Sequence, residues 1–99
     1  MGKILTIEEI KAKIRPVAEE FGLKRVSIFG SYANGTQTEE SDVDFIIEFK
    51  KERPTYFDIF DVKDGFANAT QKKVDVIRPN GLEKSYLKIK KEVNIYELQ

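Results

Sequence analysis

The chain contains no cysteine and no histidine. Their absence excludes disulfides, thiol nucleophiles, imidazole bases and the nitrogen and sulfur ligands that zinc sites use. Any acid, base or metal ligand must therefore be Asp, Glu, Lys or Tyr.

An excess of charge and a long apolar run are also absent. Seventeen Lys and Arg residues balance seventeen Asp and Glu residues, so the chain lacks the positive field that attracts nucleic acid or anionic lipid. A polynucleotide partner is therefore not favoured. Residues 1–14 mix charged with apolar residues, so we expect neither a signal peptide nor a membrane span, and a cytoplasmic protein.

The apolar content is sufficient for one small core. Leu, Ile, Val and Phe supply 30 of the 99 residues, well above the level of disordered chains. No repeat, linker or low-complexity segment divides the sequence. We therefore expect a single domain over residues 1–99.

The first element has the pattern of a capped helix. Thr6 and Glu9 have the spacing of a capping box, and apolar residues then recur at helical intervals, which predicts a helix over residues 6–21. Pro16 lies inside this helix and should kink it or mark a break at Arg15.

The remaining segments predict strands around a second helix. Thr55 can cap a helix over residues 56–70, and a turn at 79–81 precedes a short helix from Leu82. Short runs of β-branched and aromatic residues predict strands at 24–29, 43–49, 73–78 and 93–96.

The lengths of the connections predict how these strands pair. Strands 43–49 and 73–78 are joined through a helix, which favours a parallel pair with a right-handed crossover. Strand 24–29 reaches strand 43–49 through a polar loop of about a dozen residues, which favours an antiparallel pair. The fold class is therefore α/β (α+β), a small mixed β-sheet flanked by helices.

This topology places five candidate site residues at one edge of the sheet. Gly30 and Ser31 follow the first strand, while Asp42, Asp44 and Asp75 lie at the starts of the next two. Asp42 and Asp44 should project from one face. An unpaired carboxylate inside an apolar strand costs several kcal/mol, and repulsion within the cluster would raise pKa values unless a cation were bound.

The ligand types indicate which cation and which substrate. Carboxylate oxygens suit Mg²⁺ or Mn²⁺, and two such ions about 3.5–4 Å apart could hold the attacking and leaving oxygens of a phosphoryl displacement. At Gly30-Ser31 the backbone can approach phosphate closely, and the Ser31 hydroxyl can donate a further bond. The cluster therefore suits a metal-bound nucleoside triphosphate.

The motifs that contain these residues resemble those of a known family. The stretches FGSYANG, SDVDF and VDVI resemble the DNA polymerase β-like nucleotidyltransferase superfamily, whose motif is G-S, ten residues, then D-x-D, with a carboxylate on a later strand. The resemblance implies that fold, with Gly30 and Ser31 holding the triphosphate. It also implies that Asp42 and Asp44 bind both Mg²⁺ ions and that Asp75 binds the catalytic one and helps deprotonate the attacking hydroxyl.

The small size resembles the minimal nucleotidyltransferases of toxin–antitoxin systems. That resemblance implies a protein adenylyltransferase that acts as antitoxin by transferring AMP from ATP to a tyrosine of a HEPN-domain toxin, with which it forms a hetero-oligomer. The family usually has arginine where this chain has Asn34, so the chain could instead neutralise the toxin by stoichiometric binding with a weakened site. Nucleotidyl transfer to a small molecule is a further alternative.

The second predicted helix has a wide apolar face. It is either ordinary core or, in part, a surface that meets a partner chain. Its residues are Tyr56, Phe57, Ile59, Phe60, Val62 and Phe66.

Overall fold

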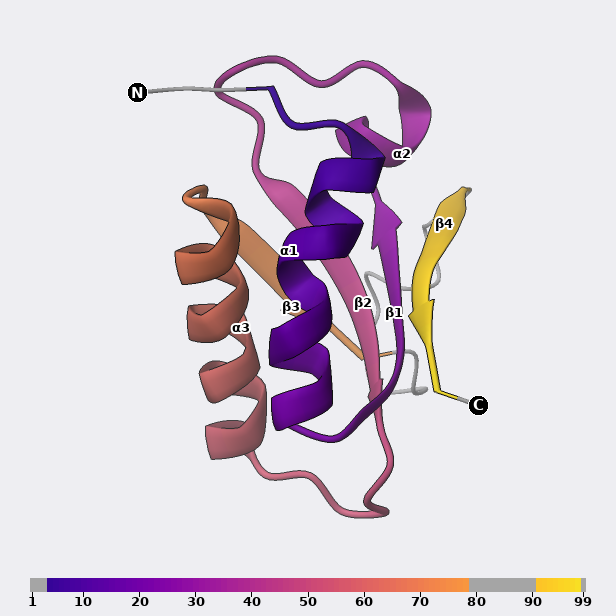
Figure 1. Cartoon of the computed structure of the whole chain (residues 1–99), viewed down its shortest axis with the longest axis vertical. Coiled ribbons are helices and arrows are strands. Elements are labelled where there is room, and N and C mark those ends of the chain that lie inside the picture. The colour runs from indigo at the N-terminus through magenta and orange to yellow at the C-terminus, as the bar shows by residue number, and fades with distance from the viewer. Residues whose placement is uncertain (1–3, 79–90, 99) are drawn as a thin grey trace.

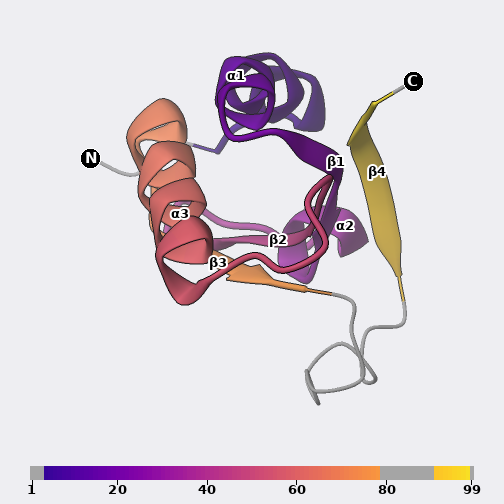
Figure 2. The same cartoon turned by 90° about the horizontal axis from the view of Figure 1, so that it is seen from below.

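The structure, a computed structural model, describes residues 4–78 and 91–98. A four-stranded sheet carries two long helices on one face (Figures 1 and 2). The elements are α1 (Ile7–Glu20), β1 (Leu23–Phe29), α2 (Ser31–Asn34), β2 (Val43–Phe49), α3 (Tyr56–Thr70), β3 (Val74–Ile77) and β4 (Glu92–Glu97).

Both long helices begin at the residues that the sequence predicts. The backbone N–H of Glu9 donates to the Thr6 hydroxyl over 3.0 Å, and the backbone N–H of Thr6 donates to the Glu9 carboxylate over 3.0 Å. Thr55 and Asp58 form the equivalent capping box at the start of α3. Each box satisfies N–H groups that have no partner inside the helix.

Of the two outcomes predicted for Pro16, the break at Arg15 does not occur, because α1 continues through Pro16 to Glu20. Proline removes one helical N–H, which leaves the carbonyl of Ala12 without its usual donor. Both Ala12 and Pro16 are exposed, so water can reach that carbonyl and the helix persists.

The sheet is mixed, as the connections predict. β1 pairs antiparallel with β2, and β2 pairs parallel with β3, giving the order β3-β2-β1-β4. The expected strand at 93–96 is confirmed and forms the other edge, antiparallel to β1. The expected turn at 79–81 and the helix from Leu82 lie outside the described residues. None of the described helices is long and apolar enough to span a membrane.

The core lies between the sheet and the two helices. Phe45 of β2 packs against Phe66 of α3, with ring centroids 4.6 Å apart. Val26 and Ile28 of β1 are fully buried beside them. Burial of such side chains contributes about 1.5–3 kcal/mol each, which holds the strands in the register that sets the site.

Candidate active site

Three neighbouring strands bring the predicted site residues together. Phe29, the last residue of β1, pairs with Asp44 of β2, and Asp44 pairs with Asp75 of β3. Because residues in register lie on the same face of a sheet, Asp44 and Asp75 stand side by side. Gly30 follows Phe29 directly, so the turn after β1 lies next to Asp44.

Gly30 has a conformation and a neighbour that exclude a side chain. Its φ is +75° and its ψ is −148°, a region that is open almost only to glycine. A Cβ at this position would overlap the Asp44 carboxylate, 3.3 Å from Asp44 Cγ and closer still to an oxygen. The turn therefore needs glycine in order to pass the carboxylate.

The same turn starts the short helix α2. The N–H groups of Ala33 and Asn34 donate to the Gly30 carbonyl over 3.1 and 3.0 Å. No side chain caps the beginning of α2, and Ser31 is only partly buried. The first N–H groups of α2 are therefore open to an acceptor such as a phosphate oxygen.

Asp44 is the most strongly perturbed acid of the site. Burial, together with the charges of Asp75 and Asp42, raises its pKa from 3.8 to about 6. The side chain is half-buried, and among the described residues no cation pairs with it. Bound cationic charge would relieve this electrostatic cost.

Asp42 and Asp75 are more open than the sequence suggests. Asp42 lies one residue before β2, and both side chains are exposed. Asp75, although flanked by Val74 and Val76, is therefore not a buried carboxylate. Its Oδ1 accepts a hydrogen bond from the backbone N–H of Val76 over 3.1 Å, and β3 lies at an edge of the sheet where solvent reaches it.

The oxygen ligands fit Mg²⁺ that is shared with a substrate. Within the described residues, no three acidic side chains form a cage for one ion. Mg²⁺ at nucleotide sites is usually held by one or two carboxylates, with water and substrate phosphates completing its shell. Asp42, Asp44 and Asp75, close to the open turn at Gly30, match that pattern.

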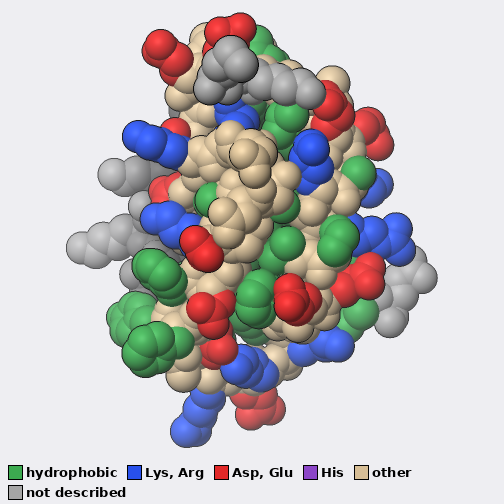
Figure 3. Space-filling view, turned by 60° about the vertical axis from the view of Figure 1, so that its left-hand side comes forward, with side chains coloured by type: hydrophobic (Ala, Val, Ile, Leu, Met, Phe, Trp, Pro, Cys, Tyr) green, Lys and Arg blue, Asp and Glu red, His purple; other side chains and the backbone are tan. Residues whose placement is uncertain are grey.

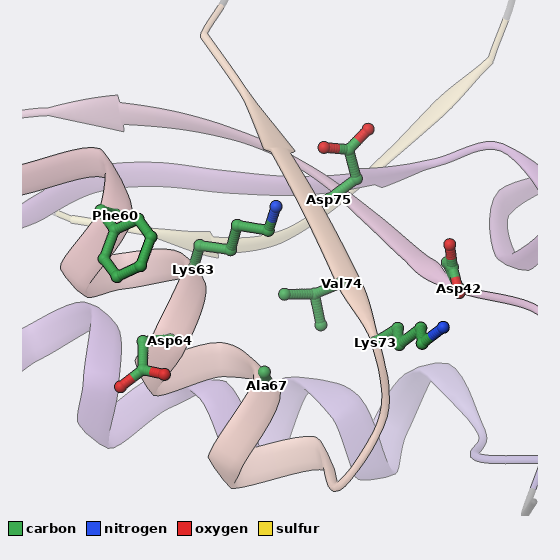
Figure 4. A pocket seen from close by; sticks show the side chains of 8 residues that line it. All are labelled: Asp42, Phe60, Lys63, Asp64, Ala67, Lys73, Val74 and Asp75. Atoms are coloured by element: carbon green, nitrogen blue, oxygen red, sulfur yellow. The ribbon is translucent and has the colours of Figure 1, made fainter. Parts of the chain in front are cut away.

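A groove of about 490 Å³ leads away from these carboxylates between α3 and β3 (Figure 4). Asp42, Lys73, Val74 and Asp75 line it on one side, and Phe60, Lys63, Asp64 and Ala67 of α3 line it on the other. Sequence reasoning missed the groove because the predicted crossover places α3 against the sheet without indicating which of its side chains face β3.

The apolar face of α3 divides into a core part and an exposed part. Val62 and Phe66 are fully buried, whereas Tyr56, Phe57 and Phe60 are 89%, 82% and 68% exposed. Figure 3 shows exposed hydrophobic side chains among charged ones on one side of the molecule. The buried residues of this face belong to the core, and the exposed ones are available to a partner chain.

The raised pKa of Asp44 predicts a pH dependence of stability. In chelator-treated protein, the free energy of unfolding is expected to fall as the pH rises from about 4 to about 6. The folded state holds this proton more tightly than the unfolded chain, whose pKa is 3.8, so the stabilisation is complete below 3.8 and lost as folded Asp44 ionises near 6.

Urea unfolding of the unaltered protein and of Asp44→Asn at several pH values measures this effect. The difference between the two proteins isolates Asp44 from other acids. The pKa of Asp58 is lowered, chiefly by its hydrogen bond to Lys51. Its contribution to stability therefore has the opposite sign, because it is lost as the pH falls. Parallel pH curves for the two proteins would show that Asp44 is not perturbed.

Comparison with known proteins places this site in a family. The pattern of the nucleotidyltransferase domain matches residues 10–96. The provisionally named protein adenylyltransferase MJ1215 of Methanocaldococcus jannaschii is 39% identical over 85 residues, 82% of this chain and 98% of that protein. The protein adenylyltransferase MntA of Thermococcus cleftensis is 28% identical over 89 residues, 86% of this chain and 89% of that protein.

Solved structures agree with the sequence comparison. A provisionally named minimal nucleotidyltransferase superimposes with a TM-score of 0.67 at 26% identity, covering 85% of this chain and 88% of its own. A toxin–antitoxin complex with AMP-PNP shares the fold with a TM-score of 0.74 at 19% identity, covering 90% of this chain and 74% of the matched one. The mixed sheet, the site at its edge and the match to nearly the whole sequence together show that this chain belongs to the nucleotidyltransferase domain family.

Proposed function

We propose that this chain transfers AMP from ATP to a tyrosine hydroxyl of a HEPN-domain toxin and thereby acts as its antitoxin. The observation that carries the proposal is the alignment of the Gly30 turn, Asp44 and Asp75 on three adjacent strands. It sets a turn that suits a phosphate group beside carboxylates that suit Mg²⁺. Nucleotidyl transfer needs this combination, because charge on the phosphates must be held and neutralised.

Each residue has a role in the proposed reaction. Asp42 and Asp44 would hold two Mg²⁺ ions, and Asp75 would join them at the catalytic one. When bound, Mg²⁺ supplies positive charge that neutralises the phosphate oxygens. The Gly30 turn and the Ser31 hydroxyl hold the triphosphate.

The reaction itself is a displacement at the α-phosphorus. The tyrosine oxygen forms a bond to that atom, the bond to the bridging oxygen of pyrophosphate breaks, and pyrophosphate leaves. Asp75 is exposed at the open side of the site, where it can accept the hydroxyl proton.

Several relatives support the choice of partner. The relatives from Methanocaldococcus jannaschii and Thermococcus cleftensis are both named for AMP transfer to protein. A neighbour in fold is the MNT antitoxin that was solved with the tri-AMPylated HEPN toxin of Shewanella oneidensis, with a TM-score of 0.69 and 14% identity. A HEPN-domain protein is therefore the partner to test.

Asn34 favours one alternative, neutralisation by stoichiometric binding. It is exposed at the end of α2, where the family pattern has arginine. Asparagine lacks the permanent charge and forked geometry of a guanidinium, so transfer could be weak while binding persists.

Mass spectrometry of the partner separates the two functions. The HEPN-domain protein is incubated with this chain and Mg²⁺-ATP, and then again with EDTA or with Asp42→Ala protein. We expect a gain of one or more AMP groups that disappears in both controls, because each removes the means of holding metal-bound phosphate. Toxin inhibition without any gain in mass, unchanged in Asp42→Ala, would overturn AMP transfer and favour binding alone.

A further inference from the structure

The groove between α3 and β3 has an acidic part and an apolar part. Asp42 and Asp75 line it on the side of the strands, and the exposed ring of Phe60 lines it on the side of α3 (Figure 4). Its volume of about 490 Å³ lies within the roughly 300–1,000 Å³ of sites that hold a small ligand or a few side chains. The groove is thus continuous with the proposed catalytic site without being the site itself.

The geometry of the proposed reaction indicates on which side of Asp44 the acceptor lies. In a displacement at phosphorus, the attacking oxygen and the leaving pyrophosphate lie roughly in line, on opposite sides of the phosphorus. The Gly30 turn follows β1, on one side of Asp44, and β3 with the groove lies on the other. With the triphosphate at Gly30, the acceptor must approach from the side of the groove.

The lining of the groove suits a peptide segment. Phe60, Ala67 and Val74 offer apolar surface, which an aromatic acceptor side chain can cover. Lys63 extends from α3 toward the strand that carries Asp75, and within the described residues Lys63 and Lys73 form no ion pair (Figure 4). Each lysine can therefore donate hydrogen bonds to carbonyl or carboxylate oxygens of an occupant of the groove.

From this arrangement we infer that the groove between α3 and β3 seats the acceptor segment of the partner protein, with Phe60 and Lys63 holding a tyrosine-bearing stretch against Asp75. This inference rests on the proposed function and adds the surface that selects the acceptor. Phe60, Lys63 and Lys73 are then acceptor-binding residues.

Steady-state kinetics with the HEPN-domain partner as acceptor test the inference. In Phe60→Ala and Lys63→Glu, the KM for the acceptor is expected to rise on the order of 10-fold, as for one well-placed contact in an interface. The kcat and the Kd for Mg²⁺-AMP-PNP, measured by calorimetry, should stay within about twofold. Both side chains are exposed, so the fold should persist.

Matched controls lie at the far end of the sheet. Leu98→Ala and Lys24→Glu repeat the two kinds of change at exposed positions, where the N–H of Leu98 donates to the carbonyl of Lys24 over 2.8 Å. These variants should leave the acceptor KM unchanged.

Each other outcome overturns a different statement. An unchanged acceptor KM in both groove variants would overturn the inference while leaving the proposed function intact. Weaker binding of Mg²⁺-AMP-PNP in those variants would assign the groove to the nucleotide and overturn the inference as well. No AMP transfer by the unaltered protein would overturn the proposed function, and the inference with it.

Discussion

Asp44→Asn protein is expected to transfer AMP more slowly by a factor on the order of 10²–10³, the loss typical of removing one preorganised electrostatic group. Asp44 stands between the Gly30 turn and Asp75, so it is the carboxylate best placed to join metal and phosphate. Asparagine keeps the shape of the side chain and removes its charge. Single-turnover transfer of labelled AMP to the HEPN-domain protein measures the effect.

The same change is expected to stabilise the metal-free protein above pH 6. Ionised Asp44 is destabilising there, since burial and two acidic neighbours raise its pKa. The gain should be about 1 kcal/mol once solvent screening of a half-exposed group is allowed for. Lower activity together with higher stability is the expected result of replacing a functional carboxylate. Replacing a structural carboxylate would lower both activity and stability.

A binding measurement and a control variant complete this test. Mg²⁺ with AMP-PNP should raise the melting temperature of the unaltered protein and have little effect on Asp44→Asn. Asp61→Asn removes an exposed carboxylate of α3 that does not line the groove, and it should behave as the unaltered protein does. Transfer by Asp44→Asn within a few-fold of normal would exclude Asp44 from the chemistry.

The sequence predicts most of the fold because its signals are local. Thr55 and Asp58 mark the start of α3 through their own hydrogen bonds, and the apolar run over 43–49 matches β2. The directions of the strands follow from the lengths of their connections. The sequence leaves open whether Pro16 kinks the helix or breaks it, because the effect depends on whether solvent reaches a carbonyl one turn away.

The sequence predicts which residues of the site come together, but it does not predict their exposure or the groove beside them. Motif spacing and strand direction place Gly30, Asp44 and Asp75 together, as the register confirms. The exposure of Asp75 depends on β3 being an edge strand, and the groove depends on α3 lying beside it. The first depends on the strand order, and the second depends on which side chains α3 turns toward the strand that follows it; no local pattern records either of them.

A methyl group at Gly30 is expected to disable the site, because the Gly30 turn and the Asp44 carboxylate compete for the same space. In Gly30→Ala the new Cβ would overlap Asp44, so the turn or the carboxylate must move. Strain at this backbone conformation costs about 1–3 kcal/mol of folding free energy. Displacement of about 1 Å between the phosphate-binding turn and Asp44 should lower AMP transfer by a factor on the order of 10².

Gly35→Ala is the matched control, because it separates backbone strain from the overlap with Asp44. Gly35 has nearly the same φ, +76°, but nothing lies within 4 Å of a Cβ built there. Its replacement should therefore cost about 1 kcal/mol of stability through the left-handed conformation alone and leave transfer nearly normal. Urea unfolding and AMP transfer are measured on both variants. Equal losses of transfer in the two would mean that any added strain in this loop impairs transfer, and that contact between Gly30 and Asp44 has no special part in it.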